Sequence, residues 1–302
     1  MKRLLYIYNP AAGRHKAKES LSDVLEVFAR QGYEITAHPT LERGDATNAV
    51  IRQGGCVDRV VCCGGDGTLN ETVQGLLALP PECRPVLGYI PAGTTNDFSR
   101  TLELPKTVVE LTEVAGEGNP RPIDVGEAGG RLFTYVAAFG LFTDVSYSTP
   151  QASKNLLGHF AYVLEGAGKL GNIPSYHMTV TASDGREVEG DFIYGMVGNT
   201  VSVGGLVNLP RDKVQLDDGR FEVILIRQPK NGKDWQSILT ALTTLELGED
   251  GAVVGFEAGE VTFTCDTPVA WTVDGEFGGE QEVTHVKCLP QALTMASGGS
   301  FS

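Results

Sequence analysis

The chain of 302 residues contains 41% hydrophobic and 21% charged residues, which excludes a disordered chain and fits one large or two ordinary folded domains. The formal net charge of -14 argues against nucleic acid as a partner. No run of about 18 apolar residues occurs, so the sequence predicts no membrane-spanning helix.

Acidic residues gather in the second half of the chain. Between Glu246 and Glu282 there are ten acidic residues and no Lys or Arg, so we expect this stretch to lie away from anionic lipid. The six cysteines have no C-x-x-C spacing and are expected to be reduced, buried thiols. With no signal-peptide core before the first strand, these features predict a cytoplasmic location.

The first hundred residues alternate between buried strands and amphipathic helices. Strands are expected at 4–8, 33–38, 57–63 and 86–90. Helices are expected at 16–31, at 45–53 with Asp45 as the cap, at 69–79 and at 96–102. This order predicts an α/β N-terminal domain with an open parallel sheet, which binds ligands where loops leave the carboxyl ends of its strands.

From Pro122 the sequence changes to short alternating runs separated by Gly, Asp and Asn. Strands are expected at 133–138, 177–181, 192–197, 221–226, 261–264 and 283–288, and helices at 155–169 and 233–247. This texture predicts a second domain that is a mostly antiparallel β-sandwich. We therefore expect an α/β domain at 1–121, joined by the tail at about 289–302, and a β-rich domain at 122–288.

The most informative motif is an apolar strand that runs directly into a glycine-rich turn and a helix. Gly64, Gly65 and Gly67 let backbone N–H groups approach an anion, and the following helix N-terminus adds further donors. Asp66 would repel phosphate, so its natural partner is Mg²⁺ bridging to nucleotide phosphates. The alternative is an ordinary strand-to-helix turn in which Thr68 is the helix cap.

Two further turns follow predicted strands. Residues 9–13 combine a rigid Pro10 with Gly13 and form a second candidate phosphate loop. Residues 91–98 offer the hydroxyl of Thr94 and the carboxylate of Asp97, and their alternative is a capped helix.

Together these segments resemble the diacylglycerol kinase catalytic-domain family, which includes bacterial lipid kinases and sphingosine kinases and is distantly similar to NAD kinases. The matching segments occur in order along nearly the whole chain: 9–13, 43–46, 64–70, 91–98, 123–126, 216–219 and 273–276.

The resemblance implies a site for ATP as the phosphoryl donor, with Asp66 acting on the phosphates through Mg²⁺. The implied nucleotide-binding residues are Asn9, Pro10, Ala11, Ala12, Gly13, Thr40, Gly64, Gly65, Asp66, Gly67, Thr68, Leu69, Asn70 and Thr94.

The resemblance also implies that Glu276 is the base that accepts the proton of the lipid hydroxyl, with Asp97 and Asp124 nearby in a network of carboxylates, water and metal. A base is chemically sensible because an alcohol is a poor nucleophile. Read without the other motifs, 273–276 is better explained as a β-turn with exposed carboxylates, and the other motifs reverse that preference.

A second metal site is implied at 215–220. The Asp218 carboxylate and the backbone carbonyls of Gln215 and Arg220 would bind a structural Mg²⁺. An Asp-Gly hairpin turn is the alternative at this position.

The function implied is an ATP-dependent lipid kinase that converts diacylglycerol to phosphatidic acid. Its membrane acceptor requires transient membrane contact, for which the basic residues at 14–18, Lys154 and Lys169 are candidates, so we expect a peripherally membrane-associated cytoplasmic protein. The alternatives are an NAD kinase-like phosphotransferase and a catalytically silent lipid- or nucleotide-binding protein. A homodimer is left open.

Overall fold

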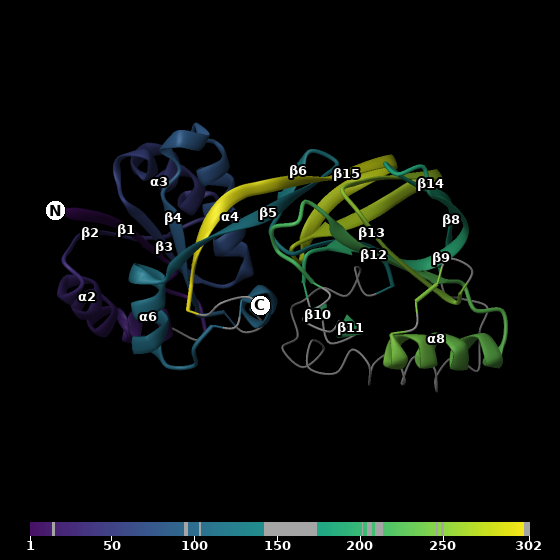
Figure 1. Ribbon diagram of the computed structural model, residues 1–302, viewed down its shortest axis with the longest axis horizontal. Coiled ribbons are helices and arrows are strands. Elements are labelled where there is room, and N and C mark those ends of the chain that lie inside the picture. Colours follow the sequence, from purple (N-terminus) through teal and green to yellow (C-terminus); the bar gives the residue numbers. More distant parts are fainter. Residues whose placement is uncertain are drawn as a thin grey trace. The chain divides into compact units, whose positions relative to one another are not determined.

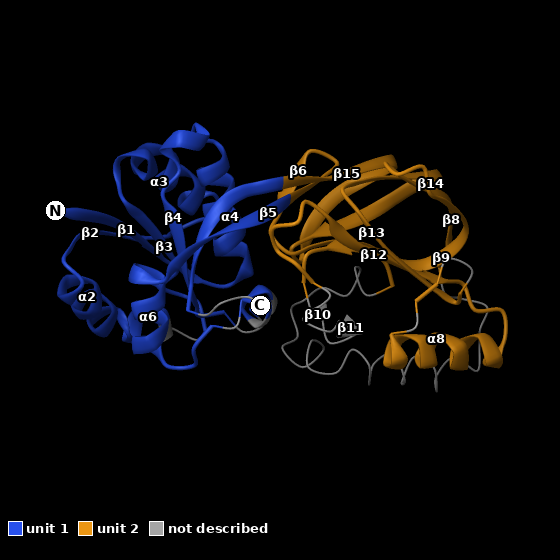
Figure 2. Cartoon of the chain, viewed as in Figure 1, with its two compact units in different colours: residues 1–125, 290–302 blue, residues 126–289 orange. Residues whose placement is uncertain are grey.

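The structure is a computed structural model that describes residues 1–13, 16–93, 96–102, 104–141, 174–200, 202–203, 207–208, 214–245, 247–248 and 251–298. The chain divides into two compact units, and each is described by itself (Figure 2). Unit 1 comprises residues 1–125 and 290–302, and unit 2 comprises residues 126–289.

Four strands near the start of unit 1 pair in parallel. β1 (Lys2–Tyr8) lies between β2 (Tyr33–Pro39) and β3 (Arg59–Gly64), and β3 pairs with β4 (Val86–Pro91). The middle strands are apolar at consecutive positions because both of their faces are covered. The loops that follow β1, β3 and β4 therefore leave the strands at one common edge.

The helices of unit 1 cover both faces of these strands. α2 (Leu21–Arg30) and α6 (Val108–Glu117) lie side by side, and Phe28 and Leu111 join a core cluster with Cys63 (Figure 1). The next residue toward the N-terminus, Cys62, instead contacts Thr72 of α4 (Asp66–Leu77). Since neighbouring strand residues point to opposite faces, α4 covers the other face, where it packs on α3 (Asp45–Gln53).

Two expected features of the helices are wrong. The helix predicted over 16–31 is divided into α1 (Lys16–Glu19) and α2, with Ser20 outside helical geometry at ψ 3°. Asp45 is not a cap but the first residue of α3, after Gly44 at φ 86°. Its carboxylate instead accepts the backbone N–H groups of Leu41 and Glu42, which lie outside the helix.

Two long strands continue from one unit into the other. β5 (Asn119–Ala128) follows α6, and β15 (Glu276–Ser297) returns the chain to unit 1. In unit 1, Met295 of β15 pairs in parallel with Leu87 of β4. The Arg84 guanidinium donates to the Ala292 carbonyl at 2.9 Å, which fixes the returning strand.

In unit 2, two strands that are distant in the sequence occupy one position in the sheet. β7 (Val136–Gly140) and β8 (Tyr176–Ala182) both lie between β9 (Glu187–Gly198) and β14 (Glu260–Val273), one after the other. The outer edge of β9 pairs with β12 (Phe221–Arg227), and β12 pairs with β13 (Val253–Ala258). The outer edge of β14 pairs with β15.

The core of unit 2 is built from these strands and is rich in aromatic side chains. Phe139, Phe263 and Trp271 pack together, with ring centroids 4.9–5.9 Å apart. Helix α8 (Gly232–Thr244) begins at a capping box formed by Asn231 and Asp234. The remaining elements are α5 (Asp97–Thr101), the 3-10 helices Gly54–Cys56 and Pro81–Cys83, and the short strands β6 (Arg131–Phe133), β10 (Ser202–Val203) and β11 (Val207–Asn208).

Two expectations for the rest of the chain are wrong, and a third concerns residues outside the described ranges. The strand predicted at 133–138 is interrupted between β6 and β7, because the N–H groups of Thr134 and Tyr135 donate to the Asp274 side chain. The helix predicted at 155–169 lies outside the described residues. Cys56 and Cys83 are exposed rather than buried, because each ends a short surface 3-10 helix.

Candidate functional site

The loop after β1 is shaped by Asn9. Its backbone N–H donates to the Cys63 carbonyl, which ties the loop to β3, and its side-chain oxygen accepts the N–H of Ala11 at 2.9 Å. Ala12 is buried, and Gly13 adopts φ 57°, a conformation that glycine favours. The predicted loop 9–13 is therefore held open by local hydrogen bonds at the carboxyl edge of β1.

The second loop joins β3 to α4 and contacts the first. Thr68 is buried, and its hydroxyl lies 3.5 Å from the Asn9 side-chain nitrogen. A Cβ at Gly64 would approach Thr68 Cβ to 2.6 Å, so this position requires glycine. Gly65 precedes α4 and Asp66 is its first residue, so the carboxylate and the first-turn N–H groups lie together at the helix N-terminus.

The third loop follows β4 and approaches the second very closely. A Cβ at Gly93 would lie 2.6 Å from the Gly65 Cα, and the Ala92 N–H donates to the Gly64 carbonyl at 2.8 Å. Asn96, at φ 49°, braces this loop by exchanging two hydrogen bonds with the Gly93 backbone. Asp97 begins α5, while Thr94 lies outside the described residues.

A fourth loop, after β2, is fixed to α4 by a residue to which sequence reasoning gave no role. The Thr40 N–H donates to the Tyr8 carbonyl, which places Thr40 beside the start of the first loop. The Glu71 carboxylate accepts the N–H groups of Gly44 and Ala46, at 2.8 and 3.3 Å. A carboxylate one helical turn beyond a phosphate loop is the signal that could have revealed this brace.

Asp124 is almost fully buried in unit 1, at 1% exposure. Its Oδ1 atom accepts the backbone N–H of Gln291 at 2.7 Å, and Gln291 has φ 47°. This carboxylate therefore holds the returning strand β15, in addition to any part in the predicted network.

Glu276 belongs to unit 2, whereas Asp66, Asp97 and Asp124 belong to unit 1. It is exposed and begins β15, directly after the two-residue turn formed by Asp274 and Gly275. Both turn residues have positive φ, 47° and 83°, which is typical of a type I′ hairpin. The 273–276 motif is thus a β-turn, but the alternative expected both carboxylates to be exposed, whereas Asp274 is buried and Glu276 exposed.

The proposed second metal site lies on a turn before β12. Gln215 and Asp218 are exposed, and the Asp218 carboxylate accepts the Arg220 N–H at 2.9 Å. Carboxylate and carbonyl oxygens are ligands that Mg²⁺ prefers, so this donor set fits the metal. Beside it, burial raises the pKa of Glu222 to about 8, and its Oε2 atom is buried without a hydrogen-bond partner in the described structure.

Within the described part of the chain, no group of three or more His, Cys, Asp or Glu side chains is arranged to hold a metal ion. Mg²⁺ commonly binds one or two protein carboxylates together with nucleotide phosphates and water, and the Asp66 carboxylate at the start of α4 fits that kind of site.

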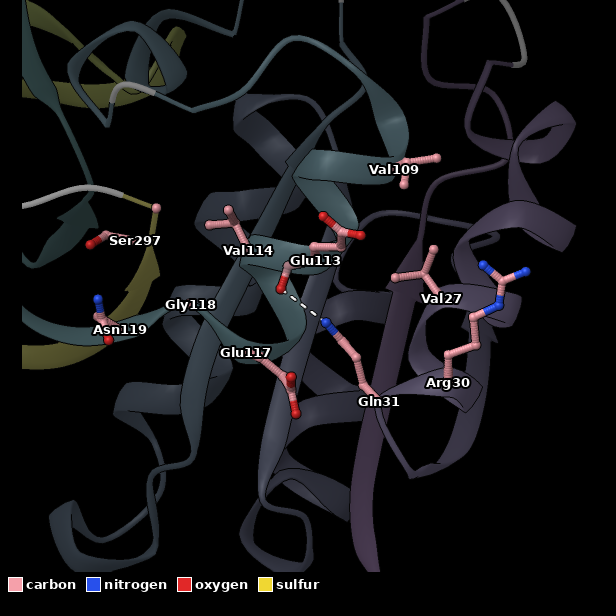
Figure 3. A pocket seen from close by; sticks show the side chains of 11 residues that line it. Val27, Arg30, Gln31, Val109, Glu113, Val114, Glu117, Gly118, Asn119 and Ser297 are labelled. Atoms are coloured by element: carbon pink, nitrogen blue, oxygen red, sulfur yellow. Dashed lines mark hydrogen bonds between the residues drawn. The ribbon is translucent and has the colours of Figure 1, made fainter.

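A cavity of about 510 Å³ lies elsewhere in unit 1, along α2 and α6 (Figure 3). Arg30, Glu113 and Glu117 line it, and the Gln31 side chain donates to the Glu113 carbonyl at 3.1 Å. None of the predicted site residues lines this cavity.

Two protein-family models match most of the chain. The diacylglycerol kinase catalytic domain model matches residues 3–128, and the YegS C-terminal NAD kinase beta sandwich-like domain model matches residues 138–297. Diacylglycerol kinase of Bacillus subtilis (strain 168) is 35% identical over 92% of this chain and 91% of its own length. Diacylglycerol kinase of Staphylococcus aureus (strain MRSA252) is also 35% identical, over 92% of this chain and 87% of its own.

A solved structure supports the fold. A diacylglycerol kinase from Bacillus anthracis str. Sterne superposes with a TM-score of 0.76, covering 100% of this chain and 98% of its own, at 24% identity. The family model and these relatives define the class of enzyme as a lipid kinase. The chain belongs to the diacylglycerol kinase family.

Proposed function

We propose that the protein transfers the γ-phosphate of ATP to the hydroxyl of diacylglycerol and so makes phosphatidic acid. The observation that carries this proposal is the meeting of glycine-rich loops after β3 and β4, where a side chain at Gly93 would overlap the Gly65 backbone. Helix α4 begins directly after Gly65, and a helix N-terminus presents backbone N–H groups that favour phosphate oxygens. The acceptor is chosen from the named relatives, which are diacylglycerol kinases.

The nucleotide is bound by the loops of unit 1. Asn9 and Thr68 join the first two loops, and Thr40 contributes from the loop after β2. The resemblance adds Thr94, which lies outside the described residues. When bound, Mg²⁺ neutralises charge on the phosphates during transfer. Asp66 orients the hydrated metal from the start of α4, and the helix N-terminus stabilises phosphate charge.

Glu276 accepts the proton of the lipid hydroxyl. The residue is exposed at the start of β15, where an acceptor can reach it, and its turn is rigid. A positioned general base contributes roughly 10²–10⁴-fold to a rate. Asp97 and Asp124 complete the carboxylate network around the transferred group, and the Asp124 backbone contact keeps its carboxylate in place.

The two units have separate roles in this proposal. The parallel strands of unit 1 act as the open nucleotide-binding sheet, and unit 2 acts as a β-sandwich that binds the lipid. No helix in the described ranges has both the length and the hydropathy needed to cross a membrane. We further propose a cytoplasmic protein that contacts the bilayer transiently and peripherally, with exposed Lys18 among the basic contacts. A dimer stays untested.

The test is a transfer assay with γ-labelled ATP, Mg²⁺ and mixed micelles containing diacylglycerol, with NAD as a soluble acceptor. We expect labelled phosphatidic acid, its loss in Asp66→Ala, and a loss of transfer with near-normal ATP binding in Glu276→Gln. Glu280→Gln is the matched control, because Glu280 is an exposed carboxylate on the same strand. Label only in NADP, or no label in any acceptor, would contradict the proposal.

A further inference from the structure

Asp274 is the most completely hydrogen-bonded carboxylate in the described part of unit 2. It is only 4% exposed, and four donors surround it. Oδ2 accepts the backbone N–H and the hydroxyl of Thr134, at 2.7 and 2.6 Å. Oδ1 accepts the N–H groups of Tyr135 and Val136, both at 3.1 Å. Hydrogen bonds of this number fix the orientation of a buried carboxylate.

The donors belong to Thr134 and Tyr135 of the link between β6 and β7 and to Val136, the first residue of β7, all more than a hundred residues away in the sequence. The contact is reciprocal, because the Asp274 N–H donates to the Val136 carbonyl at 2.9 Å. Thr134 and Tyr135 lie between the two strands, outside regular strand pairing, and their N–H groups are directed to Asp274 instead. The turn before Glu276 is therefore anchored from outside its own hairpin.

The other side of Glu276 is also fixed. Trp271 pairs with Gly279 and Thr272 with Phe277, so Gly278 is an extra residue that forms a β-bulge. A Cβ at Gly278 would lie 2.7 Å from a methyl group of Val273, so the bulge requires glycine. Bulges next to active sites often direct a side chain. Glu276 thus lies between an anchored turn and a bulge.

An Asp-Gly turn closes a hairpin without such an anchor, because its backbone twist already matches that of the strands. The hydrogen bonds of the buried Asp274 carboxylate are therefore not needed to form the turn. What it adds is a fixed direction for the residue after Gly275.

We propose that Asp274 is a positioning residue, which holds the base Glu276 in its productive orientation through the hydrogen bonds of its carboxylate to the β6–β7 link. This inference rests on the proposed function, because it needs Glu276 to be the base. A misplacement of about 1 Å in a reacting group costs on the order of 100-fold in rate.

The test measures lipid phosphorylation by Asp274→Asn, Glu276→Gln and the double variant. Asparagine keeps one acceptor oxygen but turns an NH₂ group toward two N–H donors, so the anchor is weakened. We expect kcat to fall on the order of 10- to 100-fold with an unchanged KM for ATP. In the Glu276→Gln background the same change should have no further effect, because Asp274 acts only through Glu276.

A second pair of variants covers the case in which Asp274→Asn fails to fold. Thr134→Val removes one of the four donors, and Thr134→Ser keeps it. Thr134→Val should lower kcat and Thr134→Ser should restore it, with KM for ATP constant in both. A full rate in Asp274→Asn, or a multiplicative loss in the double variant, would overturn the inference. No transfer by the unmodified protein, or full activity of Glu276→Gln, would instead refute the proposed function.

Discussion

The buried carboxylate of Asp124 accepts the backbone N–H of Gln291 at 2.7 Å, so two residues that are 167 positions apart in the sequence join β5 to β15. The contact lies where β15 returns to unit 1, at a residue with φ 47°. Sequence similarity assigned Asp124 to a catalytic network, and the structure adds a packing role to that prediction.

The two roles of Asp124 can be separated by two substitutions. Asp124→Ala leaves the Gln291 N–H without this acceptor and should lower the free energy of unfolding by about 1–3 kcal/mol. Asp124→Asn keeps an acceptor oxygen and should retain most of that stability while losing the charge. Urea denaturation of both variants gives the stabilities, and the transfer assay gives the rates. Equal stability of the two variants would show that the Gln291 contact is unimportant.

The close approach of Gly65 and Gly93 predicts intolerance at one glycine. Gly93→Ala should lower the free energy of unfolding by about 1–3 kcal/mol, because its Cβ would overlap the Gly65 backbone. The KM for ATP should rise as the loops separate. Gly232→Ala is the matched control, because no atom lies within 4 Å of its Cβ position. Thermal melts and ATP titrations compare the Gly93→Ala and Gly232→Ala variants. Equal stability and equal ATP affinity in both variants would contradict the packing argument.

Glu71 should affect nucleotide binding without contacting phosphate. Glu71→Ala removes the acceptor for the N–H groups of Gly44 and Ala46, which frees the loop that carries Thr40. We expect the KM for ATP to rise about three- to tenfold, since one net hydrogen bond is about 1 kcal/mol. Glu82→Ala, an exposed carboxylate on a surface 3-10 helix, should leave KM unchanged. An unchanged KM in Glu71→Ala would show that the Glu71 hydrogen bonds do not affect nucleotide binding.

The turn at Asp218 predicts a stabilisation by Mg²⁺ that does not need nucleotide. Without ATP, Mg²⁺ should raise the Tm relative to EDTA, because a ligand that binds only the folded state stabilises it. Asp218→Ala should abolish this shift, while the neighbouring Asp217→Ala should retain it. A shift of equal size in all three proteins would place the ion elsewhere.

His177 predicts a pH-dependent stability in unit 2. Its hydrogen bond to Asp191, 2.9 Å from Nδ1, raises the pKa of His177 above its ordinary value of 6.5, and Asp266 and Glu189 add to this. Because the folded pKa is the higher one, the stabilisation is complete below 6.5 and is lost as pH rises through the folded value. The urea midpoints of the unmodified protein and His177→Gln should differ at pH 5.5 and converge at pH 8.5. A pH-independent difference would contradict the ion pair.

Local chemistry accounts for the parts that the sequence determined. A strand, a turn and a helix start are predicted by the apolar run at 60–63, the glycines after it and the polar residues that follow. The structure confirms them as β3 and α4. Short alternating runs similarly predicted β8, β9 and β12, because side-chain periodicity depends only on neighbouring residues.

Contacts between distant residues decided the rest. The gap between β6 and β7 exists because Asp274 takes their N–H groups, and no local pattern near Thr134 records that partner. Contacts between distant residues also explain three other features: the shared sheet position of β7 and β8, the Glu71 hydrogen bonds to the loop after β2, and the Asp124 contact with Gln291. A side chain's hydrogen-bonding partner depends on which segments the folded chain brings together, and sequence spacing does not contain that information.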